Sequence, residues 1–287
     1  MMEFAIRPDN KLVGKQIQDL KLDECCIVSA IFRKQEIVIP HDGVINRRNG
    51  CGSTVADQQL PERKPMRVVI KIGGSLIKEA PELVDRLVKE FGSGNPKIPE
   101  EACASEGLPY SILIVPGGGI FADAVRKTDE SFSLSADAAH WMAILGMEQY
   151  ACYLKDKSHA LGIDSIASLP QGVSVLFPYR LLRTEDPLPH SWDVTSDTIA
   201  AWVAKQIGAT LIKTTDVDGI FRNGKLVREI SAASYRGSRE SCIDFALPEF
   251  LLKNRMECLI VNGKSSDRVI QAMYGKSVLG TVVKGNI

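Results

Sequence analysis

Two strand-like runs that each end in a cluster of glycines constrain the fold more than any other feature of this sequence. The run RVVIKI, residues 67–72, stops at the glycine pair 73–74, and the run SILIVP, residues 111–116, stops at the glycine triplet 117–119. A helix is predicted after each cluster. A buried strand, a glycine turn and a helix, repeated along one chain, are typical of a mostly parallel sheet with helices on both faces.

The same alternation continues toward the C-terminus. It first predicts a long helix from about 135 to 155, a strand at 173–178 and a proline-broken loop up to Trp192. A helix follows, which Thr195 or Ser196 caps and Gly208 ends, and then a strand at 210–215 and a hairpin turn at Asn223-Gly224. The last predicted elements are a strand at 258–263, a helix at 266–274 and a strand at 279–283. The predicted fold class is therefore α/β, in a domain that spans residues 67–287.

The first 66 residues have a different character. Residues 46–66 are rich in Gly, Pro, Gln and charge and poor in large apolar residues, so they predict a linker. Residues 1–45 predict a small α+β segment with two strands, the second of which ends at Pro40. This segment is too small to be an enzyme by itself, so the chemistry is expected after the linker.

Charge and hydropathy exclude several classes of function. The chain has 287 residues with 35 Lys and Arg against 35 Asp and Glu, so it has no global positive field for nucleic acid or an anionic membrane. Residues 1–12 lack the apolar core of a signal peptide, and no stretch approaches the ~18 apolar residues of a membrane span. We expect a cytoplasmic protein without nucleic-acid or membrane partners.

The seven cysteines are scattered and odd in number, with no C-x-x-C pair and no clustered histidines. This pattern argues against a disulfide framework and against a zinc site, and it predicts reduced thiols. No residue is therefore assigned as a protein ligand of a metal.

Lysines inside apolar strands mark the expected reactive centre. One residue separates Lys71 from the first glycine loop, and Lys213 lies within the strand TLIKTT. A buried lysine is costly without an anionic partner, and glycine loops at helix N-termini let backbone N–H groups approach phosphate oxygens. Together they indicate a site for a phosphate chain. The alternative is that the glycines merely form tight turns between strand and helix.

Two other nucleotide-binding patterns fit less well. Gly117, Gly119 and Ala122 satisfy the dinucleotide pattern G-x-G-x-x-G/A, but no acidic residue closes a strand about 20 residues later to hold a ribose. A Walker-type P-loop is excluded because the Gly-Lys-Ser stretches at 263–265 and 275–277 lack the required upstream glycine.

Five motifs resemble the amino acid kinase family in their order and spacing: KIGGSLI at 71–77, VPGGG at 115–119, DVTSDTIAAWVA at 193–204, TTDVDGIF at 214–221 and IVNG at 260–263. The resemblance covers residues 66–287. It implies a three-layer αβα sandwich with a mostly parallel sheet, preceded by the small N-terminal α+β segment. It also implies a homo-oligomer that transfers the γ-phosphoryl group of ATP, with Mg2+, to a carboxylate, carbamate or phosphate.

The resemblance implies roles for individual residues. Lys71 resembles the lysine that stabilises the transferring phosphoryl group, and Asp197 resembles the aspartate that orients the catalytic lysines. The implied phosphate-binding positions are Gly73, Gly74, Ser75, Gly117, Gly118 and Gly119. The implied nucleotide-binding positions are Thr214, Thr215, Asp216, Asp218 and Gly219. Phosphoryl transfer needs positioning and charge neutralisation more than a covalent participant, so these groups suffice.

One motif of the family is missing from this chain. Many members carry TGGM and a second lysine before the penultimate strand, where this sequence reads CIDFALPEFLLKNRMECLIVNG. The second catalytic cation is therefore open between Lys213 and Lys253. The loss of this lysine also leaves open a nucleotide- or oxyanion-binding protein of the same fold without turnover.

Three further segments resemble the archaeal kinases of methanofuran biosynthesis: DAAHWMAILGMEQYA, HSWDVTSDTIAAW and PEFLLKNRMECLIVNG. The resemblance implies a small phosphorylated substrate, an aminomethylfuran with a phosphate ester, whose phosphate oxygen attacks without a general base. Its ammonium group needs a carboxylate or an aromatic face, for which Trp192, Asp193 and Asp137 are candidates. His190 is either a further acceptor-binding residue or an exposed loop residue. Isopentenyl phosphate and acetylglutamate kinases are the alternatives within the family.

The N-terminal segment carries a resemblance of its own. Residues 9–45 resemble the first half of the C-terminal domain of potassium-transport regulators, a ligand-sensing module. This implies a regulatory or oligomerisation role. The alternative is translation from Met66, immediately before the first kinase strand, with residues 1–65 as an extension.

Overall fold

The computed structural model describes residues 31–33, 36–38, 66–92, 110–235 and 242–285 of a chain that divides into two units, Met1–Pro61 and Glu62–Ile287. In the first unit, β1 (Ile31–Arg33) and β2 (Glu36–Val38) form an antiparallel hairpin. The rest of the predicted N-terminal segment and residues 46–65 of the predicted linker lie outside the described residues.

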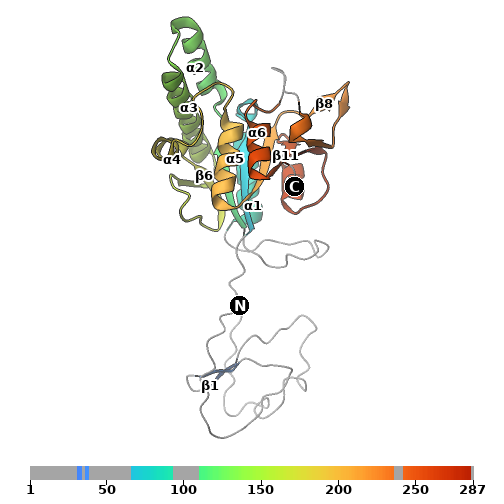
Figure 1. Cartoon of the computed structure of the whole chain (residues 1–287). Coiled ribbons are helices and arrows are strands. Elements are labelled where there is room, and N and C mark those ends of the chain that lie inside the picture. Colours follow the sequence, from blue (N-terminus) through green and yellow to red (C-terminus); the bar gives the residue numbers. More distant parts are fainter. Residues whose placement is uncertain (1–30, 34–35, 39–65, 93–109, 236–241, 286–287) are drawn as a thin grey trace. The chain divides into compact units, whose positions relative to one another are not determined.

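An eight-stranded sheet forms the centre of the second unit (Figure 1). Its strand order is β10-β12-β11-β7-β3-β4-β6-β5. The strands from β11 to β5 are parallel, whereas β12 is antiparallel to β11 and β10 is parallel to β12. Their bounds are β3 (Met66–Ile72), β4 (Tyr110–Pro116), β5 (Leu161–Ile163), β6 (Gly172–Leu176), β7 (Thr210–Thr215), β10 (Glu229–Ser231), β11 (Glu257–Asn262) and β12 (Gly280–Lys284). The predicted mostly parallel sheet is confirmed.

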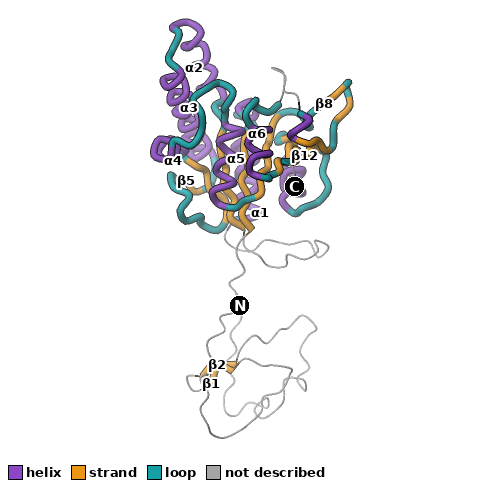
Figure 2. The backbone as a smooth tube through the Cα atoms, viewed as in Figure 1, coloured by secondary structure: helices purple, strands orange, loops and turns teal. Residues whose placement is uncertain are grey.

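Helices cover both faces of the sheet and complete a three-layer αβα sandwich (Figure 2). One apolar core lies between the sheet and α1 and α7, the other between the sheet and α5 and α6, while α2 packs against α3. The helices are α1 (Ala80–Phe91), α2 (Gly119–Phe132), α3 (Ala136–Lys157), α4 (Pro178–Glu185), α5 (Ser196–Ile207), α6 (Leu247–Asn254) and α7 (Ser266–Met273).

Local signals in the sequence place several element ends correctly. The side chain of Thr195 caps α5, and Gly208 ends it with a φ of 61°. Asn223-Gly224 forms the turn between β8 (Phe221–Arg222) and β9 (Lys225–Leu226). One prediction is wrong, because α4 begins at Pro178 where the sequence favoured a loop. Proline suits the first turn of a helix, since its φ is already helical and that turn needs no N–H donor.

Strand alternation brings the two predicted lysines to one face of the sheet. Val69 of β3 and Leu211 of β7 belong to the core under α5. Because successive side chains of a strand point to opposite faces, Lys71 and Lys213, each two residues further on, also lie on the α5 side.

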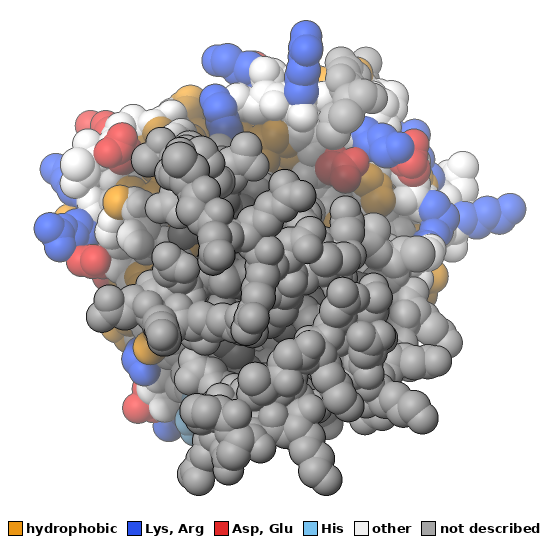
Figure 3. Space-filling view, turned by 90° about the horizontal axis from the view of Figure 1, so that it is seen from below, with side chains coloured by type: hydrophobic (Ala, Val, Ile, Leu, Met, Phe, Trp, Pro, Cys, Tyr) orange, Lys and Arg blue, Asp and Glu red, His pale blue; other side chains and the backbone are white. Residues whose placement is uncertain are grey.

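The surface carries both signs of charge. On the face shown in Figure 3, the described lysine and arginine side chains are interspersed with aspartate and glutamate around the rim, in keeping with the zero net charge. Within the described parts of the chain, no helix has both the length and the apolar character that a membrane span requires.

Candidate active site

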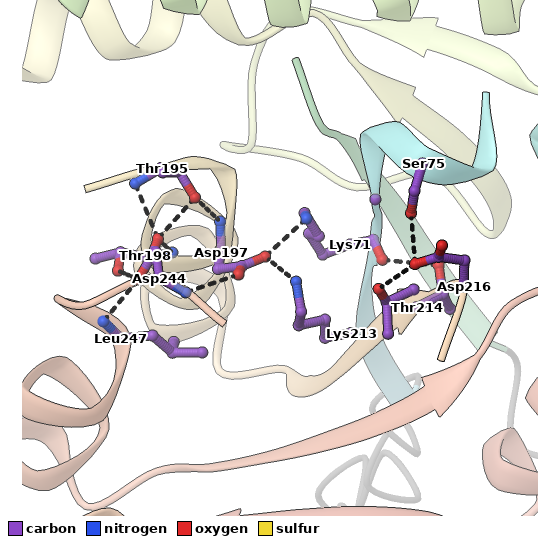
Figure 4. A network of polar contacts seen from close by, with 12 residues as sticks. Lys71, Ser75, Thr195, Asp197, Thr198, Lys213, Thr214, Asp216, Asp244 and Leu247 are labelled. Carbon is purple, nitrogen blue, oxygen red and sulfur yellow. Dashed lines mark hydrogen bonds and ion pairs between the residues drawn. The ribbon is translucent and has the colours of Figure 1, made fainter. Parts of the chain in front are cut away.

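Three buried charged residues form the centre of the candidate site. Lys71 and Lys213 are register partners on the neighbouring strands β3 and β7, and Asp197 lies in the first turn of α5. The Nζ atoms of Lys71 and Lys213 lie 2.7 Å and 2.5 Å from Oδ1 of Asp197. Figure 4 shows both ammonium groups pointing to this one carboxylate. Asp197 therefore holds two cations side by side near the carboxyl ends of two strands.

The three charges set one another's pKa values. Burial, together with the second ammonium group, lowers the pKa of Lys71 to about 8 against the attraction of Asp197. Burial also disfavours charge on Lys213, but Asp197 outweighs it and raises the pKa of Lys213. Burial opposes ionisation of Asp197 as well, yet the two lysines hold the pKa of its carboxyl well below its usual range. The cluster is thus net positive at neutral pH, and an anion would balance it.

Asp244 fixes Asp197 from the side opposite the lysines. Its backbone N–H donates to Oδ2 of Asp197 at 3.1 Å. Its carboxylate accepts five hydrogen bonds of 2.7–3.0 Å, from the N–H and hydroxyl groups of Thr195 and Thr198 and from the N–H of Leu247 (Figure 4). Burial and the charge of Asp197 raise the pKa of Asp244, and the donors from Thr198 oppose that shift. Asp244 thereby joins the start of α5 to the start of α6.

The two predicted glycine loops meet beside this centre. The Gly73 N–H donates to the Thr214 carbonyl at 3.0 Å, and the Gly117 N–H donates to the Ile72 carbonyl at 2.8 Å. A Cβ added to Gly74 would lie 2.5 Å from the Cα of Gly119, so the loop backbones touch and a side chain at position 74 does not fit. Because α2 begins at Gly119, the positive end of its dipole lies at the same junction.

The predicted nucleotide-side loop follows β7 and lies next to the first glycine loop. The hydroxyl of Thr214 donates to the Lys71 carbonyl at 3.0 Å. The hydroxyls of Ser75 and Thr215 donate to Oδ1 of Asp216 at 3.0 Å and 3.3 Å. The first contact joins β7 to β3 directly, and the contact between Ser75 and Asp216 joins the loops that follow these two strands.

Asp218, in the same loop, connects it to the last part of the sheet. It forms an ion pair with Arg268 of α7 and accepts a hydrogen bond of 3.1 Å from the side-chain amide of Asn262 in β11. These two partners hold the pKa of Asp218 below its usual value. Gly219 comes next in the chain, before the β8–β9 hairpin.

A pocket of about 460 Å³ lies on the other side of the glycine loops. Its inner end is formed by residues 74–75 and 118–119 and by the start of α5 at Thr195 and Ser196. About half of its wall is apolar, and this part includes Leu134, Ala139, Ile144, Met147, Val194 and Ile199. Asp123, Arg126 and Asp129 of α2 bring charge to this wall.

Trp192 connects two of these charged residues. Its indole Nε1 donates to Oδ2 of Asp129 at 2.7 Å, and the guanidinium carbon of Arg126 lies 4.6 Å from the centre of its ring. The backbone N–H of Leu134 donates to the other oxygen of Asp129 at 3.0 Å. The indole is therefore held between a cation on its face and an anion at its edge.

His190 does not line the pocket but stacks on a residue that does. Its ring lies 4.0 Å from that of His140, which forms part of the pocket wall. Its Nδ1 lies 2.6 Å from Asp137 and its Nε2 lies 2.9 Å from Asp186. Burial and the neighbouring His190 lower the pKa of His140 to about 4, so this part of the wall is uncharged at neutral pH.

Among the described residues, one group of three side chains could hold a metal ion. His140, Asp186 and His190 can place one ligand atom each within 4.8 Å of one another. Both ring nitrogens of His190 already contact carboxylates, so a metal would have to displace one of them.

Two other sequence candidates lie away from the pocket. The side chain of Asp193 is exposed, and its carbonyl accepts a hydrogen bond from the N–H of Ala246. Lys253 is exposed on α6, whereas Lys213 contacts Asp197 directly. The geometry therefore favours Lys213 over Lys253 as the second cation.

Sequence reasoning missed Asp244, Arg126 and Asp129. Asp244 precedes Leu247-Pro248 at the spacing of a helix start, a signal that could have predicted its capping role. Arg126 and Asp129 belong to FADAVRKTDESF, which reads as an ordinary exposed helix face. Their shared indole lies more than 60 residues further along the chain, so no local pattern links them to it.

Sequence comparisons now define the class of protein. The sequence model of the Amino acid kinase family matches residues 66–245. A [5-(aminomethyl)furan-3-yl]methyl phosphate kinase from Methanocaldococcus jannaschii is 30% identical over 226 residues, which cover 76% of this chain and 97% of that protein. A uridylate kinase from Methanobrevibacter smithii is 23% identical over 244 residues, 76% of this chain and 99% of that protein. This chain belongs to the amino acid kinase family.

Solved structures support the same fold. The uridylate kinase of Archaeoglobus fulgidus superposes with a TM-score of 0.54 at 19% identity, covering 76% of this chain and 100% of that one. The UMP kinase of Ureaplasma parvum gives a TM-score of 0.55 at 16% identity, covering 77% and 99%. At such low identity the likeness shows the three-layer fold alone.

The N-terminal segment matches a different family. The model of the TrkA-C domain matches residues 1–45. The Trk system potassium uptake protein TrkA homolog 2 of Methanosarcina mazei is 73% identical over 41 residues, which are 14% of this chain. This chain spans only 9% of the length of that relative.

Proposed function

We propose that this protein transfers the γ-phosphoryl group of ATP to [5-(aminomethyl)furan-3-yl]methyl phosphate and so forms the diphosphate in methanofuran biosynthesis. The observation that carries the proposal is the buried pair of lysines on one aspartate, placed beside two glycine loops that also line a pocket with its own cation and anion. The choice of acceptor is supported by 30% identity to a kinase of that name, over 97% of its length.

In this mechanism the two lysines act on the transferring phosphoryl group. Lys71 and Lys213 stabilise the negative charge that develops on its oxygens, and Asp197 keeps their ammonium groups aligned. Asp244 is a positioning residue, since it acts by holding Asp197. In the loops 73–75 and 117–119, the N–H groups of Gly73 and Gly117 hold the loops in place, and the remaining backbone N–H groups bind phosphate oxygens at the start of α2.

ATP enters from the side of the loop that follows β7. Thr214, Thr215, Asp216, Asp218 and Gly219 line this side and contact the nucleotide. The Ser75 hydroxyl and the Asp216 carboxylate lie 3.0 Å apart and would supply oxygen ligands of the kind that Mg2+ prefers. Bound with ATP, Mg2+ would neutralise charge on the phosphates.

The acceptor occupies the pocket on the other side of the glycine loops. Its nucleophile is an oxygen of a phosphate monoester, which is already ionised at neutral pH, so the reaction needs no general base. Trp192 and the inner end of the pocket orient this phosphate toward the lysines. His190 supports the pocket from behind His140.

The remaining parts of the chain take regulatory and structural roles in this proposal. Residues 67–287 form the catalytic domain, which works as a homo-oligomer. Residues 1–45 form a small regulatory segment, and residues 46–66 link it to the catalytic domain. The match of residues 1–45 to the TrkA-C domain supports a ligand-sensing role.

A uridylate kinase is the second candidate. The specific observation in its favour is the 23% identity to such an enzyme over 99% of its length. Uridine monophosphate also presents a phosphate to the lysines, so the mechanism would be the same and the acceptor pocket alone would differ.

The test is transfer of labelled phosphate from Mg-ATP to a panel of aminomethylfuran phosphate, uridine monophosphate, isopentenyl phosphate and N-acetylglutamate, with Lys71→Ala as the control. We expect product with the furan phosphate and none with Lys71→Ala. Product with another acceptor alone would replace the substrate and keep the mechanism. Tight ATP binding without any product would indicate a binding protein.

A further inference from the structure

We propose that Asp129 selects acceptors that carry a primary ammonium group, while Arg126 binds the acceptor's phosphate. This assignment rests on the proposed kinase function and specifies how its pocket recognises a zwitterionic substrate. It differs from the sequence expectation, in which Trp192, Asp193 and Asp137 were the candidates for the ammonium group.

The first argument is the charge of Asp129. Its two oxygens accept hydrogen bonds from the indole N–H of Trp192 and the backbone N–H of Leu134, and both donors are neutral. No Lys, Arg or His of the described residues lies within ion-pair distance of it. Asp129 is half-buried in the pocket wall, so its carboxylate is partly withdrawn from water without a cation to compensate. A ligand ammonium group would supply that cation.

The other acidic residues nearby are engaged or face elsewhere. Asp137 contacts the ring of His190 at 2.6 Å, and the side chain of Asp193 is exposed outside the pocket wall. Asp123 lines the pocket, but its carboxylate lies 3.7 Å from the guanidinium of Arg126. Asp129 is therefore the pocket carboxylate that lacks a cationic partner.

The face of Trp192 is not available to the ammonium group on the side of Arg126, because the guanidinium already lies there at 4.6 Å from the ring centre. Stacking on the indole also fixes the guanidinium, and a fixed guanidinium suits two-pronged recognition of a phosphate. The pocket therefore offers a positive group on the face of one indole and a negative group at its edge.

The order of these groups along α2 sets the orientation of the acceptor. Arg126 lies seven residues after Gly119, about 10 Å along the helix axis, and Asp129 lies almost one turn further. Helix side chains lean toward the N-terminus, so the long Arg126 side chain reaches back toward the glycine loops. An acceptor whose phosphate binds Arg126 near the loops directs its other end toward Asp129.

The experiment compares two acceptors that differ in one group: [5-(aminomethyl)furan-3-yl]methyl phosphate and its 5-hydroxymethyl counterpart. The full-length protein and its Asp129→Asn variant are assayed for kcat and KM with each. We expect Asp129→Asn to lower kcat/KM for the amine by about 10- to 100-fold, mainly through KM, because a charged hydrogen bond is lost. The hydroxymethyl compound should be affected little, so the preference for the amine disappears.

Two further variants complete the design. Glu130→Gln removes an exposed carboxylate from the neighbouring position of α2 and should leave the ratio between the acceptors at its wild-type value. Arg126→Gln should raise KM for both acceptors alike, since both carry the phosphate.

The possible results separate this assignment from the proposed function. If Asp129→Asn lowers activity equally with both acceptors, its role is structural and the assignment is overturned while the kinase function stands. A loss of preference in Asp123→Asn instead would move the role to that carboxylate. Wild-type protein that phosphorylates neither compound would overturn the proposed function and the assignment together.

Discussion

The two sides of the glycine loops are built in opposite ways. On one side, Lys71, Lys213 and Asp197 are almost fully buried and each is fixed by another charged group. On the other side, the pocket, where we propose that the acceptor binds, has charged residues on a helix surface, and its carboxylate at Asp129 is met only by neutral donors. The two lysines and Asp197 are paired with one another and leave one positive charge in excess, whereas the pocket has a carboxylate that a cationic ligand could pair with.

This difference separates the shared chemistry from the specific recognition. A centre made of strand residues and a capped helix is rigid, so in the proposed mechanism it could serve more than one phosphate acceptor. A pocket made of helix-face and loop residues can change without disturbing that centre. Variants on the two sides should therefore fail in different ways, and four experiments can break or sharpen the contrast.

The largest effect is expected from Asp197→Asn. The change leaves two buried ammonium groups next to each other without a counterion, so we expect the free energy of unfolding to fall by about 3–5 kcal/mol at neutral pH. Urea denaturation followed by circular dichroism measures this. Asp193→Asn, which removes an exposed carboxylate four residues earlier, should change stability by no more than about 0.5 kcal/mol. Equal stabilities of the two variants would contradict the view that Asp197 holds the centre together.

Lys71→Met should separate catalysis from stability. Asp197 keeps Lys213 as its partner, so the cluster becomes neutral and the free energy of unfolding should change by less than about 1 kcal/mol. The rate of phosphoryl transfer should fall by roughly 10²- to 10³-fold, because a group that stabilises the transition state is gone. Urea denaturation and the transfer assay give the two readouts. A variant that unfolds as readily as Asp197→Asn would show that Lys71 is a structural residue.

The same contrast explains what the sequence could predict. Lys71 and Lys213 stand out because charge interrupts apolar strands, and Asp197 follows a capping threonine at a helix start. Each of these signals is local, and strand alternation brings them to one face. Asp129 and Arg126 give no such signal, because an acidic and a basic residue on a helix surface are ordinary. Their meaning depends on Trp192, which only the folded chain brings beside them.

Local signals were also insufficient where a residue has two structural meanings. Pro178 can end a strand or begin a helix, and the sequence favoured a loop after it. The segment forms the helix α4, in which Leu182 packs into the core under α5. Asp244 is a similar case, since five donors from three separate residues converge on it only after α5 and α6 have packed.

The pH dependence of catalysis tests the charge of the reactive centre. Lys71 has a pKa lowered to about 8, so its ammonium form is lost as the pH rises through that value, and kcat/KM for ATP should fall with it. Bound phosphates favour the charged lysine, so kcat should fall only at higher pH. Lys71→Arg keeps its charge over this range, and its residual kcat/KM should not show the same decline. A flat wild-type profile between pH 7 and 9.5 would assign the essential charge to Lys213 alone.

The smallest effect is expected on the pocket side, at His190. Hydrogen bonds to Asp137 and Asp186 raise its pKa above the ordinary value of 6.5. A histidine whose pKa is raised by folding contributes its full stability below the unfolded pKa, and the contribution is lost as the pH rises through the folded pKa. Thermal unfolding of wild type and His190→Gln should therefore differ most near pH 5.5 and converge at alkaline pH. Asp137 and Asp186 are largely exposed, so the difference should stay below about 1 kcal/mol and shrink with added salt.

His159→Gln removes an exposed imidazole that also contacts an aspartate and provides the matched control. A larger difference at alkaline than at acid pH would show that His190 is held in its neutral form, and the supporting wall of the pocket would then depend on packing against His140 and not on charge.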